Sequence, residues 1–154
     1  MILLTGLPVS AHTYSIIPYP KSLIPQEGEY IFKNGQKISF PTEISEVAKE
    51  FICRIKTVTG INLVTISESK KADISFTLQK NMANEAYKLH ITPTHITIQA
   101  STPAGFFYAI QSLYQLMPPE ISVNKRTESV NVWNAPCVQI DDEPRFAYRG
   151  MMLD

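Results

Sequence analysis

The chain of 154 residues is long enough for one domain with a substantial core and too short for a second complete domain. Its 44% hydrophobic and 18% charged residues are typical of a globular protein rather than a disordered one. The 14 basic and 14 acidic residues balance, which leaves no electrostatic basis for binding nucleic acid or an anionic membrane surface. Because no stretch of about 20 apolar residues occurs, we also expect no membrane span.

The first eleven residues have some features of a secretory signal peptide. They are mostly apolar and end in Val9-Ser10-Ala11, the small-x-small pattern of a cleavage site. They lack a basic beginning and are shorter than the usual span of about 15–30 residues. We interpret residues 1–11 as a clipped signal peptide, which predicts a secreted or periplasmic protein; the alternative is an ordinary N-terminal strand.

The two cysteines do not indicate a metal site. Cys53 and Cys137 lie far apart in the sequence, and neither has a second cysteine or a histidine at metal-ligand spacing. Two isolated thiols are more often small hydrophobic side chains than partners in a disulfide. We therefore expect no metal and no disulfide, although one bridge is conceivable in an oxidising compartment.

Turn signals and hydrophobic periodicity predict the first elements. Residues 15–20 form an extended segment whose two prolines suit a sheet edge. Strands are expected at 30–32 and 37–40, and Asn34-Gly35 between them is a strong hairpin signal. A helix over 43–59, ended by Gly60, follows from an apolar stripe at helical spacing. The stripe consists of Ile44, Val47, Ala48, Phe51, Ile52, Ile55 and Val58.

The second half changes from strands back to a helix. Alternating apolar residues predict antiparallel strand pairs at 62–67 with 72–78 and at 87–91 with 96–100. A helix over 103–117 follows, with Thr102 as its N-cap and Pro103 in its first turn. Residues 120–129 are expected to form a loop, and 130–133 and 137–140 to form strands.

Together these elements predict an α+β domain over residues 15–137. Two helices flank four alternating strands, so we expect a mainly antiparallel sheet with both helices packed on one face. Residues 138–154 are interpreted as a linker followed by the beginning of another structure.

Most candidate functional residues have a simple structural interpretation. His12, His90 and His95 are scattered. The acidic run 141–143 would point in alternate directions on an extended chain, so a solvated turn is favoured over an acid/base cluster. Phe106 and Phe107 are expected in the core rather than in a sugar-stacking platform. No phosphate-binding loop, zinc-protease motif or nucleophile elbow occurs, and we expect no cofactor.

Arg149 is the exception. It lies within the apolar, strand-like run 145–154, and a buried guanidinium requires a partner because an unpaired buried charge is very costly. That partner could be an acid elsewhere in the protein. It could equally be a polar ligand, since a guanidinium offers several donors in a fixed fork. Composition alone favours neither interpretation.

Three segments together resemble glycoside hydrolase family 20, the β-N-acetylhexosaminidases. Residues 144–154, Pro-Arg-Phe-Ala-Tyr-Arg-Gly-Met-Met-Leu-Asp, are similar to the segment that leads into the catalytic barrel of that family. Residues 102–116 are similar to a helix of that family that begins with Ala-Gly and later carries Gln-Ser-Leu and Gln-Leu. The matching residues here are Ala104-Gly105, Gln111-Ser112-Leu113 and Gln115-Leu116. Residues 17–20, Ile-Pro-Tyr-Pro, are similar to its N-terminal segment. The resemblance extends from about residue 15 to the end.

This resemblance implies a non-catalytic α+β domain, followed over residues 138–154 by a linker and the start of a (β/α)8 barrel whose first strand contains Arg149. It implies substrate-assisted hydrolysis of glycans with terminal N-acetylglucosamine or N-acetylgalactosamine, by an Asp-Glu pair on a later barrel strand. No catalytic residue is therefore expected in this chain, and the chain alone should be inactive. Arg149 would bind hydroxyls of the terminal sugar. The alternatives are a free-standing carbohydrate-binding or interaction module and the N-terminal domain of another glycoside hydrolase family.

Overall fold

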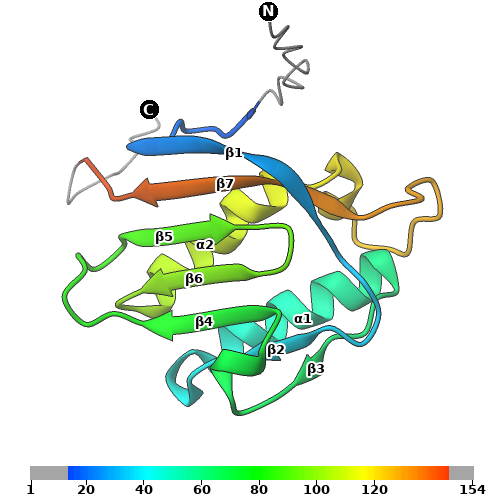
Figure 1. The fold of residues 1–154 in the computed structure, drawn as a ribbon, viewed down its shortest axis with the longest axis horizontal. Helices are drawn as coiled ribbons and strands as arrows, with labels where there is room; N and C mark the ends of the chain where they lie inside the picture. Colours follow the sequence, from blue (N-terminus) through cyan, green and yellow to red (C-terminus); the bar gives the residue numbers. More distant parts are fainter. Residues whose placement is uncertain (1–13, 146–154) are drawn as a thin grey trace, which may run out of the picture.

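The computed structural model describes residues 14–145, which form one seven-stranded sheet covered on one face by two helices (Figure 1). The α+β class predicted from the sequence is confirmed. The helices are α1 (Ser45–Thr59) and α2 (Pro103–Leu116). The strands are β1 (Ser22–Ile31), β2 (Lys37–Ser39), β3 (Val64–Thr65), β4 (Ile74–Leu78), β5 (Tyr87–Ile91), β6 (Ile96–Ala100) and β7 (Asn134–Asp142).

The sheet is mixed, so the expectation of a mainly antiparallel sheet is wrong. The strand order is β1-β7-β5-β6-β4-β2-β3. The pairs β1·β7, β7·β5 and β5·β6 are antiparallel, whereas β6·β4, β4·β2 and β2·β3 are parallel. Parallel neighbours require crossover connections, and α1 supplies the crossover between β2 and β3. The result is an antiparallel half joined to a parallel half.

Two predicted strand pairs do not form. Asn34 and Gly35 do make a turn, with φ +84° at the glycine, but β1 and β2 lie in opposite halves of the sheet. The turn binds Asn62 instead: Gly35 N–H donates to its carbonyl at 2.8 Å, and Asn34 Oδ1 accepts from its N–H at 2.8 Å. Similarly, β3 and β4 both flank β2 rather than each other. A turn motif thus bends the chain without choosing the partner strand.

The predicted β5–β6 pair is confirmed. Ile91 lies opposite Ile96 at the closed end of this hairpin, and Tyr87 lies opposite Ala100 at the open end. Thr92 N–H donates to the His95 carbonyl at 2.9 Å across the turn. Here the strands are short, adjacent in sequence and alternate cleanly, so local pattern and final pairing agree.

Both helices begin and end near the predicted residues. Gly60 caps α1 in the left-handed conformation, φ +73°, and its N–H donates to the Lys56 carbonyl at 2.9 Å. The Thr102 side chain caps α2 by accepting from Gly105 N–H, and Pro103 occupies the first turn. A 3-10 turn, Thr42–Ile44, precedes α1. Local capping signals therefore located the helices well.

The core lies between the sheet and the helices. Phe76 of β4 contacts Phe51 of α1 and Phe106 of α2, with ring centroids 5.9 and 5.8 Å apart. α2 approaches the sheet closely at Gly105, where an added Cβ would lie 2.6 Å from the Ala86 carbonyl oxygen and 2.8 Å from Ala100 Cβ. Only a residue without a side chain fits this contact.

The C-terminal part of the domain contains one long strand in place of the two short strands that were expected. Residues 130–133 are not a strand, and β7 runs continuously from Asn134 to Asp142. Within the preceding loop, a 3-10 turn at Pro119–Ser122 buries Ile121 against the core. Cys53 is exposed and Cys137 is buried, and both are free thiols. Across residues 14–145, no helix is long and apolar enough to cross a membrane.

Truncating one core-facing side chain of either helix should destabilise the domain. Phe51→Ala and Ile110→Ala each remove a nearly fully buried side chain, so we expect each to lower the free energy of unfolding by roughly 2–5 kcal/mol in urea titrations. Phe107→Ala, on the exposed side of α2, is the matched control and should cost much less. An unchanged denaturation midpoint in either core variant would contradict the assigned helix faces.

Candidate functional site

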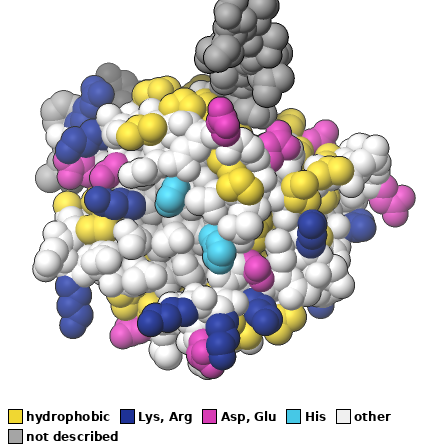
Figure 2. Space-filling view, in the orientation of Figure 1, with side chains coloured by type: hydrophobic (Ala, Val, Ile, Leu, Met, Phe, Trp, Pro, Cys, Tyr) yellow, Lys and Arg dark blue, Asp and Glu magenta, His cyan; other side chains and the backbone are white. Residues whose placement is uncertain are grey.

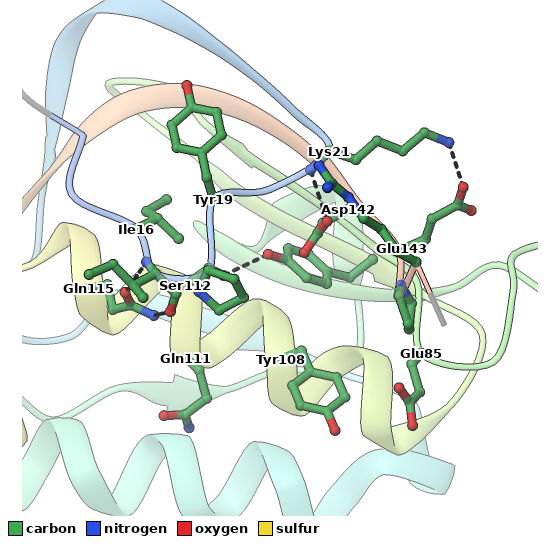
Figure 3. A pocket seen from close by; sticks show the side chains of 15 residues that line it. Ile16, Tyr19, Lys21, Glu85, Tyr108, Gln111, Ser112, Gln115, Asp142 and Glu143 are labelled. Atoms are coloured by element: carbon green, nitrogen blue, oxygen red, sulfur yellow. Dashed lines mark hydrogen bonds and ion pairs between the residues drawn. The ribbon is translucent and has the colours of Figure 1, made fainter. Parts of the chain in front are cut away.

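A groove of about 740 Å³ lies beside α2 (Figure 3). Four parts of the chain form its walls: the leading segment (residues 14–21), residues 85–87 at the start of β5, one side of α2, and the end of β7 with the residues that follow it. Its lining includes Tyr19, Lys21, Tyr87, Tyr108, Gln111, Ser112, Gln115, Asp142, Glu143 and Arg145. The groove is thus built from segments at both ends of the domain.

Hydrogen bonds hold the leading segment across α2. Ile17 N–H donates to Gln115 Oε1 at 2.7 Å, and Gln115 Nε2 donates to the Ile17 carbonyl at 3.2 Å. This reciprocal pair mimics a backbone ladder with one amide side chain. Ile16 beside it is buried in the core, so the segment is fixed by an apolar anchor as well.

Lys21 ties the same segment to the end of β7. Its backbone N–H donates to Asp142 Oδ1 at 2.9 Å, and its Nζ contacts Glu143 Oε1 at 2.5 Å. The hydrogen bond and charge of Glu143 raise the pKa of Lys21 above its ordinary value. The ion pair is exposed, and exposed pairs contribute little to stability. Its effect is to hold two chain segments side by side.

Tyr87 and Ser112 form a buried polar contact in the wall of the groove. Tyr87 on β5 lies opposite Asp142 on β7, and its hydroxyl is 2.6 Å from Ser112 Oγ on α2. The pKa of Tyr87 is raised to about 12, mainly because burial disfavours the charged phenolate; the Asp142 carboxylate also raises it, and the Ser112 hydrogen bond lowers it. This contact joins the sheet to the helix. With its raised pKa, the Tyr87 hydroxyl stays protonated and neutral at physiological pH.

The acidic side chains at the end of β7 are already hydrogen-bonded within the groove. Asp142-Glu143 is the one adjacent Asp-Glu pair in the sequence, yet both carboxylates are bound to Lys21. The residues that line the groove include no histidine or cysteine. Within residues 14–145, no cluster of three or more His, Cys, Asp or Glu side chains could hold a metal ion.

Most of the residues that the sequence offered as functional candidates lie apart from one another in the structure. His90 and His95 lie on the open side of the sheet or its turn, 3.1 Å from Gln26 and 2.8 Å from Thr94 respectively. Asp141 pairs with Lys88 at 3.2 Å. Asp141 and Asp142 do point to opposite sides, but they belong to β7 rather than to a solvated turn. Arg149, the predicted sugar-binding residue, and residues 1–11 lie outside the described residues.

One feature of α2 was wrongly predicted. Phe106 is fully buried, as expected, whereas Phe107 is 42% exposed and its neighbour Tyr108 is 37% exposed. Their rings meet edge to face, with centroids 5.7 Å apart. Successive residues on a helix are separated by about 100°, so Phe106 and Phe107 could not both face the same core. That geometry was available from the sequence.

The open face of the sheet has a different character. Figure 2 shows acidic and basic side chains dispersed over it, with no large area of one charge. The outward side chains of β5 and β6, for example Lys88, His90, Thr97 and Gln99, are polar, while the intervening residues are buried. None of these four side chains lines the groove beside α2.

The raised pKa of Tyr87 predicts a loss of stability in alkali. Between the ordinary tyrosine pKa of about 10 and the raised value, the unfolded chain releases a proton that the folded chain keeps, so the free energy of unfolding falls as the pH rises. The double variant Tyr87→Phe, Ser112→Ala removes both hydroxyls. Urea unfolding at several pH values between about 9 and 12 gives the slope of the free energy of unfolding against pH. In the double variant this slope should be shallower than in the unsubstituted chain by up to about 1.4 kcal/mol per pH unit. Identical slopes would contradict the proposed burial of the phenol.

Comparisons with known proteins agree with this architecture. Residues 13–143 match the family described as glycosyl hydrolase family 20, domain 2. The β-hexosaminidase of Vibrio furnissii is 30% identical over 144 residues, which are 94% of this chain and 22% of that protein. The β-hexosaminidase of Porphyromonas gingivalis is 28% identical, over 91% of this chain and 18% of that protein. The chain thus spans about a fifth of the length of these curated relatives.

Solved structures show the same fold. The N-acetyl-β-hexosaminidase of Streptomyces plicatus matches 87% of this chain and 27% of its own, with a TM-score of 0.76 and 28% identity. The β-N-acetylhexosaminidase of Streptomyces coelicolor also matches 87% of this chain and 27% of its own, with a TM-score of 0.77 and 27% identity. With the family match covering nearly the whole described domain, the chain belongs to glycoside hydrolase family 20 and carries its domain 2.

Proposed function

We propose that this chain is the non-catalytic N-terminal domain of a β-N-acetylhexosaminidase that removes terminal N-acetylhexosamine residues from glycans. The family match over residues 13–143 carries this proposal. The names of three relatives, two β-hexosaminidases and one N,N'-diacetylchitobiase, support the substrate class. The α+β sheet with two helices, shared with solved hexosaminidases, supports the role of the domain.

The proposed division of labour places the chemistry in a (β/α)8 barrel that follows residue 145. There the acetamido oxygen of the substrate would attack the anomeric carbon, an Asp would orient that group, and a Glu would protonate the leaving oxygen. The hydrogen bonds of Asp142 and Glu143 to Lys21 support placing the chemistry outside the described domain. Its contribution is structural. We propose a secreted or periplasmic location, which rests on the signal-like residues 1–11.

Activity measurements on two lengths of the protein test this function. The 154-residue chain should not hydrolyse a chromogenic N-acetylglucosaminide, whereas the chain joined to its downstream coding sequence should. Hydrolysis by the short chain, abolished by a point substitution within it, would contradict the proposal. A long protein that cleaves other glycosides but not N-acetylhexosaminides would favour another hydrolase family. Binding of chitobiose by the short chain alone would favour a free-standing binding module.

Arg149 is proposed to bind hydroxyls of the terminal sugar in the complete enzyme. Arg149→Lys keeps the charge but loses the planar fork, so one or two charge-assisted hydrogen bonds should be lost. Each is worth about 1.5–3 kcal/mol, and we expect kcat/KM to fall by about tenfold to a hundredfold or more. If the contact strengthens as the sugar ring distorts, kcat should fall as well. Unchanged steady-state kinetics would make Arg149 a purely structural residue.

A further inference from the structure

The Asn34-Gly35 turn carries reactive groups that its role in the fold does not use. In an Asn-Gly pair the backbone nitrogen of the glycine can attack the side-chain amide of the asparagine, because no glycine side chain hinders the approach. The space beside Gly35 is open, since a Cβ built there would meet no atom within 4 Å. Asn34 and Gly35 are both exposed to water, which is the other reactant in this chemistry.

Asn62 holds both reactive groups of the turn. The Gly35 N–H, on the attacking nitrogen, donates to the Asn62 carbonyl at 2.8 Å. Asn34 Oδ1, on the amide that would be attacked, accepts from Asn62 N–H at 2.8 Å and from Asn62 Nδ2 at 3.3 Å. These three hydrogen bonds form the Asn62 clamp. The two donors polarise the amide, but the nitrogen cannot attack while its own proton is bound to the Asn62 carbonyl.

The backbone of the turn also keeps the two groups apart. Gln36 N–H donates to the Lys33 carbonyl at 3.4 Å, and Gly35, the third residue of the turn, has φ +84°. A positive φ at this position alone is typical of a type II turn, in which the second residue has ψ of about +120°. That ψ turns the Gly35 nitrogen away from the Asn34 side chain, so the peptide plane must rotate before the nitrogen reaches Cγ. Rotation breaks the clamp, and the clamp therefore excludes the attack.

The clamp lies at a weakly held edge of the sheet. β3 contains only Val64 and Thr65, both exposed, and it lies at the end of the strand order beside β2 (Figure 1). Val64 N–H donates to the Gln36 carbonyl at 2.8 Å, and Ile66 N–H donates to the Ile38 carbonyl at 2.9 Å. A short segment with solvent-exposed hydrogen bonds and few buried side chains opens locally, without unfolding of the whole domain.

We propose that Asn34 is a site of deamidation and that release of β3 from β2 is the step that opens it. In the open state the Gly35 nitrogen gives its proton to hydroxide and bonds to Asn34 Cγ. The Cγ–Nδ2 bond then breaks, and the side-chain nitrogen leaves as ammonia with a proton from water. One water molecule opens the resulting cyclic imide, at Cγ to give aspartate or at the main-chain carbonyl to give isoaspartate. This chemistry needs no catalytic machinery, so it is independent of the proposed function.

The two products differ in their effect on the sheet edge. Aspartate keeps the backbone length and a side-chain oxygen at position 34, so it can accept from Asn62 N–H again. Isoaspartate adds one backbone carbon before Gly35, so the side-chain oxygen and the Gly35 N–H no longer reach Asn62 together. Isoaspartate at position 34 therefore leaves β3 detached and one edge of β2 unpaired.

Two proline variants of β3 test the opening step. Val64→Pro removes the N–H that binds the Gln36 carbonyl. Thr65→Pro is the matched control, because successive N–H groups of a strand point to opposite sides and that of Thr65 points away from β2. Peptide mapping by mass spectrometry at mildly alkaline pH gives the deamidation rate of Asn34. Val64→Pro should raise this rate at least about fivefold, the effect of one lost backbone hydrogen bond on a local opening equilibrium. Thr65→Pro should leave it nearly unchanged, and equal rates in the two variants would overturn the proposal.

Hydrogen exchange provides a test without substitution, which decides the question even if Val64→Pro fails to fold. The Gly35 N–H is both a donor of the clamp and the attacking group, so its protection factor measures the opening that deamidation requires. The ratio of Asn34 deamidation rates in the urea-unfolded and folded chains should match that protection factor. Faster reaction in the folded chain would show attack with the clamp closed and would overturn the proposal. Asn124, which precedes a lysine, is the internal control. Deamidation of Asn34 no faster than that of Asn124 in the unfolded chain would also overturn it.

Discussion

A single apolar layer between the sheet and its two helices determines the arrangement of everything else in the domain. Phe76 lies at its centre and contacts a phenylalanine from each helix, so the positions of α1 and α2 depend on one another through the same strand. Gly105 lets the first turn of α2 lie almost on the backbone before β5. That close approach sets the depth of the helix and brings Ser112 to the hydroxyl of Tyr87.

The surface beside α2 is a consequence of this packing. A helix of fourteen residues buries one side against the sheet, and the remaining side must face outward. In α2 the outward side carries Phe107 and Tyr108 rather than charged residues, in contrast to the outward side of the sheet. The leading segment then lies across the same helix, held by Gln115 and by Lys21, and encloses the groove. The groove therefore needs four segments from different parts of the sequence, because the start of β5 contributes Tyr87 to its wall.

The sequence predicted the local features and missed the long-range ones, for a physical reason. Helix boundaries depend on caps such as Thr102 and Gly60 and on apolar spacing within one segment, and these were predicted nearly to the residue. The β5–β6 hairpin was predicted because its partners are adjacent. By contrast, the pairing of Tyr30 with Ala135 joins residues more than a hundred positions apart, and no local pattern encodes it. The groove was missed for the same reason, whereas the family was identified because short motifs carry it.

The position of β7 has a consequence for how the domain is made. Among the seven strands of this sheet it is the last to leave the ribosome, yet it separates β1, the first, from β5. Until residues 134–142 are available, β1 has no partner and β5 presents an unpaired edge, which can recruit strands of other chains. Native pairing of the nascent chain is therefore delayed almost to the end of the domain, because the loop that β1 and β7 close spans nearly all of it. A polypeptide interrupted shortly before Asn134 would be left with these open edges, and aggregation rather than partial folding would be its expected fate.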